Sequence, residues 1–206
     1  LLTAVPGEPG HNRLNDACVG PDGCVWFGSM DDGESKATGR FYRFDRGAVA
    51  AAGPDEICIT NGPAVCSASS RAFFTDTLGK KIFVTDLADD GLPGEARLFA
   101  DTALEFPDAY PDGPTVDAEG CVWTGLWNGG AVARYSADGQ LLETVRLPVA
   151  NVTKLAFGGP DLRTAFVTTA RKGLSEAELE AQPQAGGLFA FRSEVAGVAP
   201  ALVKLS

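Results

Sequence analysis

Apolar and polar positions along the chain alternate in short runs, and turn residues separate these runs. Such short alternating runs predict β-strands. The 25 glycines and 13 prolines provide frequent turns between them. One polar stretch, Leu174–Ala181, has a helical pattern, with Ser175 as the expected N-cap and Glu176 and Glu178 in the first turn. We therefore expect an all-β chain with one short helical insertion.

One sequence pattern recurs four times. The first copy is Val19-Gly-Pro-Asp-Gly-Cys-Val-Trp-Phe-Gly28, and the third is Val116-Asp-Ala-Glu-Gly-Cys-Val-Trp-Thr-Gly125. The second copy, from Val65 to Phe74, is blurred, and the fourth, from Phe157 to Phe166, lacks the turn glycine. The intervals are 46, 51 and 42 residues between the first turn residues, which are Pro21, Ser67, Ala118 and Pro160. The chain is therefore built from repeats.

Each repeat contains three or four strand-like segments. A further strand is expected after each hairpin, at Arg40–Asp45, Lys81–Leu87, Ala131–Ser136 and Gly187–Arg192. An outer strand is expected after three of these, at Glu56–Ile59, Ala96–Phe99 and Leu142–Leu147. Three or four strands in 40–50 residues is typical of a propeller blade. An all-β sandwich is the alternative, although sandwiches seldom repeat a sequence motif.

The repeat number predicts part of a larger ring. Four blades of this size do not close a ring, and the pattern begins in mid-repeat. We therefore expect residues 1–206 to be one domain, the C-terminal portion of a six-bladed β-propeller with about four blades present, so that roughly two blades precede Leu1.

Composition excludes several classes of protein. No run of about 18 apolar residues is present, so no membrane span is expected. The net charge of −10 argues against a nucleic-acid partner. Five cysteines match no zinc spacing and are interpreted as small apolar residues in a reducing compartment: Cys18, Cys24, Cys58, Cys66 and Cys121. A cytoplasmic location follows, although the absence of a starting Met leaves a signal peptide open. The sequence indicates no oligomeric state.

The repeat also locates candidate functional residues. Six residues before each turn anchor stands a polar residue, although the strands that follow are mostly apolar: Asn15, Asn61, Asp112 and Lys154. In a propeller this position begins the innermost strand, which lines the central channel. Polar side chains from successive blades would converge there, and the oxygens of Asn61 and Asp112 are ligands that a hard divalent cation prefers.

Structural interpretations of these residues remain open. Asn61-Gly62 and Asp112-Gly113 could serve turns, and Lys154 could be a solvated or structural lysine. Asp112 is less suited to a turn because its repeat has a separate one at Glu119-Gly120. Asp22 and Asp138 are interpreted as turn residues.

Other catalytic chemistries lack their residues. The single histidine, His11, lies near the start in an expected loop, whereas a Ser-His-Asp or Cys-His mechanism needs a well-placed base. No Gly-x-Ser-x-Gly, phosphate-binding or dinucleotide motif is present. Hydrolysis would therefore rely on an oxygen-ligated metal and a carboxylate.

Several motifs resemble the SMP-30/gluconolactonase/regucalcin family over essentially the whole chain. They include Asn12-Arg-Leu-Asn-Asp16, Ile59-Thr-Asn-Gly-Pro63, Tyr110-Pro-Asp-Gly113 and Phe157-Gly-Gly159. The stretches Asn151-Val-Thr-Lys154 and Thr168-Thr-Ala-Arg-Lys-Gly-Leu174 are similar to bacterial sugar lactonases of the xylonolactonase type. The resemblance implies a six-bladed propeller.

The resemblance also implies a site. Family members bind one divalent cation through three side chains: a Glu of the first blade, an Asn and an Asp. The Asn corresponds here to Asn61 and the Asp to Asp112, whereas the Glu has no counterpart in this sequence. The substrate-contacting Arg and Asn of the family fall on Arg13 and Asn15. The metal could be Ca, Zn, Mn, Mg or Fe(II).

The expected activity is therefore hydrolysis of a small-molecule sugar lactone, such as xylonolactone, to the aldonic acid. Asp112 would be the catalytic base and a metal ligand, and Arg13, Asn15 and Lys154 would bind substrate. The alternatives are a non-catalytic calcium-binding or scaffold propeller, and a propeller esterase acting on other lactones or organophosphates.

Overall fold

The computed structural model describes residues 4–205 and confirms an all-β chain. The chain divides into two compact units. Unit 1 comprises residues 4–101 and 200–205 of the described chain, and unit 2 comprises Thr102–Ala199. The expectation that 1–206 is a single domain stays a prediction. No helix in the described part is long and apolar enough to cross a membrane.

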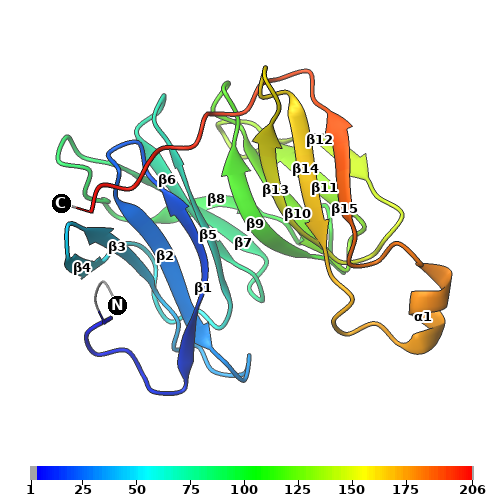
Figure 1. Cartoon of the computed structure of the whole chain (residues 1–206). Coiled ribbons are helices and arrows are strands. Elements are labelled where there is room, and N and C mark those ends of the chain that lie inside the picture. Colours follow the sequence, from blue (N-terminus) through cyan, green and yellow to red (C-terminus); the bar gives the residue numbers. More distant parts are fainter. Residues whose placement is uncertain (1–3, 206) are drawn as a thin grey trace. The chain divides into compact units, whose positions relative to one another are not determined.

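Unit 1 contains two four-stranded antiparallel sheets, each in chain order (Figure 1). The first sheet consists of β1 (Asn12–Val19), β2 (Val25–Asp31), β3 (Phe41–Asp45) and β4 (Ala48–Ala51). The second consists of β5 (Thr60–Cys66), β6 (Arg71–Asp76), β7 (Lys81–Asp86) and β8 (Arg97–Asp101).

Unit 2 contains a four-stranded and a three-stranded antiparallel sheet, again in chain order. The four-stranded sheet consists of β9 (Tyr110–Val116), β10 (Val122–Trp127), β11 (Ala131–Tyr135) and β12 (Leu141–Arg146). The other consists of β13 (Val152–Gly158), β14 (Thr164–Thr169) and β15 (Leu188–Arg192). The four sheets confirm four blades, while the six-bladed ring stays a prediction.

One predicted outer strand is wrong. Glu56–Ile59 is not a strand, and Ile57 forms only an isolated bridge with Gly39. The outer strand of the first blade is β4, because Arg46 and Gly47 both have positive φ and close a two-residue hairpin between Asp45 and Ala48. Two such residues are the signature of a tight hairpin turn, and an Arg-Gly pair is a weaker signal than Asn-Gly.

The apolar core of each unit lies between its two sheets. In unit 1, Trp26 and Phe41 of the first blade cluster with Phe74 of the second. In unit 2, Trp123 packs with Leu155 and Val167. Side chains alternate across a strand, so each sheet buries one face against its neighbour and the repeats stabilise each other.

The short helix is confirmed as α1 (Glu176–Ala181), which projects from the sheet β13-β14-β15 (Figure 1). Ser175 is its N-cap, and the Ser175 hydroxyl and Glu178 carboxylate form a reciprocal capping box. These bonds to Ser175 hold the pKa of Glu178 below its usual value. The helix has no buried residue, so capping stabilises it in place of packing.

The fourth repeat keeps the turn geometry of the first and third repeats without their glycine. Gly23 and Gly120 have φ values of 82° and 77°, and Leu162 at the equivalent position has φ 55°. A residue with a side chain is strained in this conformation by roughly 1–2 kcal/mol. The turn shape is therefore imposed by the paired strands β13 and β14.

Candidate functional site

The four polar repeat positions all lie on the first strand of a sheet. They are Asn15 on β1, Asn61 on β5, Asp112 on β9 and Lys154 on β13. In all four sheets the pairing register shifts at or beside this residue, because the first strand carries one residue more than its partner. Such bulges increase the twist of a strand and redirect its side chains, and they are frequent beside functional sites.

The bulges exclude the interpretation of Asn61 and Asp112 as hairpin-turn residues. Both lie inside strands, and in each case a Gly-Pro pair follows and forms the bulge. Gly62 has φ 81° and Gly113 has φ 46°. The Asn-Gly and Asp-Gly pairs, which resemble turn signals, therefore serve bulges within the innermost strands.

In unit 1 the side chain of Asn61 is held from two sides. Its Nδ2 donates to Thr77 Oγ1 at 2.8 Å, and its Oδ1 accepts from Asn15 Nδ2 at 3.1 Å. Asn15 Nδ2 also donates to the carbonyl of Thr60 at 2.7 Å. Asn61 is 6% exposed. The bond to Thr77 fixes the orientation of the Asn61 amide, so its oxygen is directed toward Asn15.

Arg13 extends this hydrogen-bonded row. Its Nη1 donates to Asn15 Oδ1 at 2.9 Å, and its Nε lies 3.1 Å from an oxygen of Asp32. Arg13 and Asn15 are both exposed. The structure thus brings three of the predicted site residues, Arg13, Asn15 and Asn61, into one contiguous row.

Unit 2 holds the other two predicted residues on adjoining strands. A Cβ at Gly113 would lie 2.6 Å from the carbonyl oxygen of Thr153 and 2.8 Å from Lys154 Cα. Because these atoms are backbone, only glycine at position 113 lets β9 approach β13 so closely. Asp112 and Lys154 are both partly buried. Their strands therefore meet at this level of the blade.

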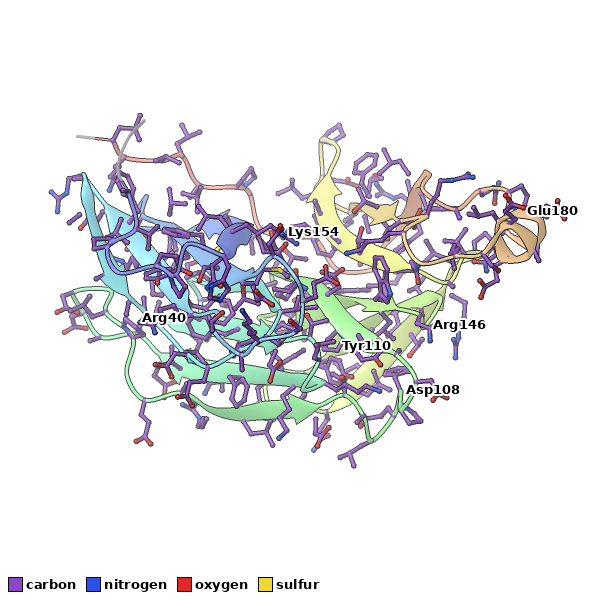
Figure 2. The ribbon with its side chains drawn as sticks, turned by 90° about the horizontal axis from the view of Figure 1, so that it is seen from below. Arg40, Asp108, Tyr110, Arg146, Lys154 and Glu180 are labelled. Atoms are coloured by element: carbon purple, nitrogen blue, oxygen red, sulfur yellow. The ribbon has the colours of Figure 1, made fainter. Side chains whose placement is uncertain are left out.

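Hydrogen bonds fix the backbone around both residues. The carbonyl of Asp112 accepts from Thr124 Oγ1 at 2.9 Å, and the carbonyl of Lys154 accepts from Thr168 Oγ1 at 3.3 Å. Figure 2 shows Lys154 and Tyr110, which precedes Asp112 on β9, apart from Glu180 on α1. The helix is therefore remote from this end of β13.

The donor set suits a hard cation better than a soft one. In unit 1 Asn61 offers an amide oxygen whose orientation is already fixed, and in unit 2 Asp112 offers a carboxylate. Oxygen ligands of this kind suit Ca²⁺, Mg²⁺ or Mn²⁺. Across residues 4–205, no three His, Cys, Asp or Glu side chains gather as a metal-binding group.

His11 has contacts that do not indicate a catalytic dyad. Its Nε2 lies 3.3 Å from Thr38 Oγ1 and 3.9 Å from an oxygen of Asp31. Hydrogen bonds from the Ser35 backbone and hydroxyl hold the pKa of Asp31 below its usual value. Asp31 thus organises its own loop, and His11 lies beside it.

Sequence reasoning missed two residues of the site. Thr77 orients Asn61, and Asp16 Oδ2 accepts from the backbone N–H of Gly62 at 3.0 Å. Asp16 therefore joins the β1 bulge to the β5 bulge. Thr77 follows β6 and is 16 positions from Asn61, so only strand pairing reveals their contact.

Comparison with known proteins identifies the family to which the sequence is similar. The sequence profile of the SMP-30/Gluconolactonase/LRE-like region matches residues 1–171. The chain belongs to this family. The resemblance seen in the sequence motifs is therefore confirmed.

Two relatives illustrate the family. The chain is 35% identical to the 6-deoxy-6-sulfogluconolactonase of Pseudomonas putida over 98% of this chain and 69% of that protein. It is 35% identical to the L-arabinolactonase of Azospirillum brasilense over 92% of this chain and 63% of that protein. The chain thus spans about two thirds of the length of these family members.

A solved structure of the family has the same fold. The calcium-binding protein regucalcin from Agrobacterium tumefaciens superposes with a TM-score of 0.92 and 31% sequence identity. The match covers all of this chain and 69% of that protein. The four blades described above are therefore shared with an experimentally determined family member.

Proposed function

We propose that the protein hydrolyses a sugar lactone to the corresponding aldonic acid with the help of a divalent cation. The row Arg13–Asn15–Asn61, fixed by Thr77 at the bulged ends of β1 and β5, is the observation that carries the proposal. The lactonase relatives supply the class of reaction. A buried amide and an exposed amide aligned with an exposed guanidinium suit recognition of a neutral, oxygen-rich molecule.

Asn61 Oδ1 and the carboxylate of Asp112 would hold the cation. When bound, the cation would polarise the lactone carbonyl as a Lewis acid. The metal could be Ca, Zn, Mn, Mg or Fe(II), with the oxygen ligands favouring the harder ions. Arg13 and Asn15 would hold sugar hydroxyls or the carbonyl oxygen, and Arg13 would stabilise negative charge on that oxygen. Lys154 would contact the sugar from β13.

The carboxylate of Asp112 would act as general base. It would accept a proton from the attacking water while the water oxygen bonds to the lactone carbonyl carbon. The ring C–O bond would then break, and the ring oxygen would take up a proton to become the new hydroxyl. One water is consumed, and one carboxylic acid and one hydroxyl are formed.

The substrate is proposed to be a pentonolactone such as xylonolactone. The resemblance of Asn151–Lys154 and Thr168–Leu174 to xylonolactonases and the similarity to an L-arabinolactonase support five-carbon lactones. The protein is expected in the cytoplasm, where it would meet such a small molecule.

Asp112→Ala tests the proposed base. We expect kcat/KM for xylonolactone to fall by at least about 100-fold, the scale of general-base catalysis, while the circular dichroism spectrum stays unchanged. Asp138→Ala, which removes an exposed turn carboxylate of the same unit, should keep wild-type activity. Chelation should abolish hydrolysis and added Mn²⁺ or Ca²⁺ should restore it. Full activity of Asp112→Ala would contradict the assigned role.

Calcium binding without catalysis is the second candidate, because the superposed regucalcin is described as a calcium-binding protein. The two functions differ in one measurement. Calorimetric binding of Ca²⁺ that is lost in Asn61→Ala, without turnover of any aldonolactone, would favour the binding protein over the lactonase.

A further inference from the structure

The turn between β9 and β10 contains a buried carboxylate that satisfies several donors. Asp117 Oδ2 accepts from Trp123 Nε1 at 2.9 Å and from Arg134 Nε at 2.8 Å. Asp117 Oδ1 accepts from the backbone N–H of Cys121 at 3.0 Å. The Arg134 guanidinium lies 5.7 Å from the centre of the Trp123 ring. This carboxylate is therefore the centre of a fully connected polar network.

The first blade repeats this frame without the carboxylate. Trp26 and Arg43 occupy the positions of Trp123 and Arg134, with the guanidinium 5.9 Å from the ring centre. The residue equivalent to Asp117 is Gly20. A Cβ there would lie 2.9 Å from Trp26 Nε1, so the indole N–H faces the missing side chain.

Two buried donors consequently lack a protein acceptor in this blade. Within residues 4–205, neither Trp26 Nε1 nor Arg43 Nε has a hydrogen-bond partner. Trp26 is 1% exposed. These are the same two atoms whose counterparts bind one oxygen of Asp117 in the third blade. A buried donor without an acceptor costs about 1–3 kcal/mol, so an oxygen atom from outside the chain would be stabilised here.

Asp22 replaces only part of the lost carboxylate. Its Oδ1 accepts from the backbone N–H of Cys24 at 3.1 Å, and its Oδ2 accepts from Arg43 Nη2 at 2.8 Å. Burial by itself would raise the pKa of Asp22, but the bonds from Arg43 and Cys24 and the charge of Arg43 together lower it. Asp22 is therefore a carboxylate that occupies Arg43 Nη2 and leaves Arg43 Nε and Trp26 Nε1 to another group.

A pocket of about 220 Å³ lies at this point, entirely within unit 1. Its lining includes Trp26, Asp22, the hydroxyl-bearing Ser67 and Ser70, and Asp89 and Asp90. One water needs only about 10–15 Å³ of space measured in this way. The pocket is therefore large enough for a small organic molecule.

The pocket lies at the far end of the blades from the row Arg13–Asn15–Asn61. Asn15 and Asn61 stand in the first halves of β1 and β5, whereas Pro21 and Ser67 follow the ends of these strands. A ligand here would therefore occupy a second site, and its binding does not rest on the proposed lactonase function.

The lining chemistry selects the class of ligand. Three carboxylates line the pocket, and the adjacent Arg43 guanidinium is already paired with one of them, Asp22, so an anion is disfavoured. A metal cation would leave the indole N–H without a partner. A hydroxyl group can accept from the indole N–H and donate to a carboxylate at the same time. We propose that this pocket binds a small neutral polyol, with one hydroxyl oxygen in the place that the Asp117 carboxylate has in the third blade.

The indole N–H resonances provide a direct test. Xylitol, a five-carbon polyol without a lactone, is titrated into the ¹⁵N-labelled chain, and the Trp26 resonance is assigned from its absence in Trp26→Phe. We expect a saturable shift of the Trp26 N–H at millimolar xylitol, while the Trp123 N–H, already bonded to Asp117, stays in place. Acetate at equal concentration should produce no saturable shift.

Two variants separate this pocket from the proposed lactone site. Gly20→Asp combined with Asp22→Glu reproduces the turn of the third blade and should weaken xylitol binding by more than about tenfold, on the scale of one lost hydrogen bond. Asn61→Ala should bind xylitol as the wild type does. An unsaturable shift, a saturable shift that survives in the double variant, or an equal response to acetate would overturn the proposal.

Discussion

The first and third blades share a sequence pattern but differ in how they satisfy the same buried donors. Both place an indole and a guanidinium side by side on paired strands, Trp26 with Arg43 and Trp123 with Arg134. In the third blade Asp117 joins both donors, and in the first blade Gly20 leaves them unpaired. The backbone of the turn is the same in both, since Gly20 and Asp117 each pair with the cysteine four residues on.

The difference shows that the repeat conserves the frame more strictly than the chemistry inside it. The aromatic and arginine side chains are fixed by strand register and burial, whereas the turn residue can change as long as the backbone is preserved. A position of this kind can therefore stabilise one blade and form a pocket in another. The predictions below test this contrast.

The largest effect is expected for Asp117→Gly, which converts the third blade to the arrangement of the first. The side chain of Asp117 is fully buried, and its removal leaves Trp123 Nε1 and Arg134 without their acceptor. The free energy of unfolding should fall by about 3–5 kcal/mol, measured by urea denaturation. Asp138→Gly, at an exposed turn, is the control and should change it far less. Equal effects of the two variants would contradict the role of Asp117.

The reverse conversion is expected to change the free energy of unfolding by less and in the stabilising direction. Gly20→Asp with Asp22→Glu should raise the free energy of unfolding by about 1 kcal/mol, because two buried donors acquire an acceptor. The gain is limited because the new Cβ would lie 2.9 Å from Trp26 Nε1, so the indole has to shift slightly. Asp22→Glu alone provides the control. A double variant no more stable than this control would show that the donors are satisfied in another way.

The smallest effect is expected for the pH dependence of the stability that Asp22 contributes. Burial alone would raise the pKa of Asp22, but the bonds from Arg43 and Cys24 together lower it, so the ionised form stabilises the fold. This contribution is fully present above the unfolded-state pKa of about 3.9 and is lost as pH falls through the lower folded-state value. Unfolding of wild type and Asp22→Asn is compared between pH 2 and pH 7. Their difference should shrink toward pH 2, and a constant difference would contradict the assignment.

Much of the fold could be predicted from the sequence. The repeated hairpins, the strands after them and the capped helix at Ser175 follow from local patterns, because strand alternation and capping act over a few residues. The outer strand of the first blade could not be placed, since the Arg46-Gly47 turn is a weak local signal. The strained turn at Leu162 likewise depends on the pairing of its strands.

Part of the candidate site could also be predicted from the sequence. The repeat spacing predicted that Asn15 and Asn61 lie on equivalent strands, and the sequence motifs were sufficient to indicate the family. The spacing gave no sign of the bulges, nor of Thr77 as the partner of Asn61. These depend on which strand residues lie opposite one another.

The sequence by itself determined the repeat, the polar residue at one position of each blade and the family. Only the tertiary structure decided which donors have acceptors: Asn61 is paired with Thr77, Trp123 with Asp117, and Trp26 with no described residue. The physical reason is that a hydrogen bond depends on positions to within a few tenths of an ångström. Such positions are set by strand register and packing across the sheet, which a linear pattern does not encode.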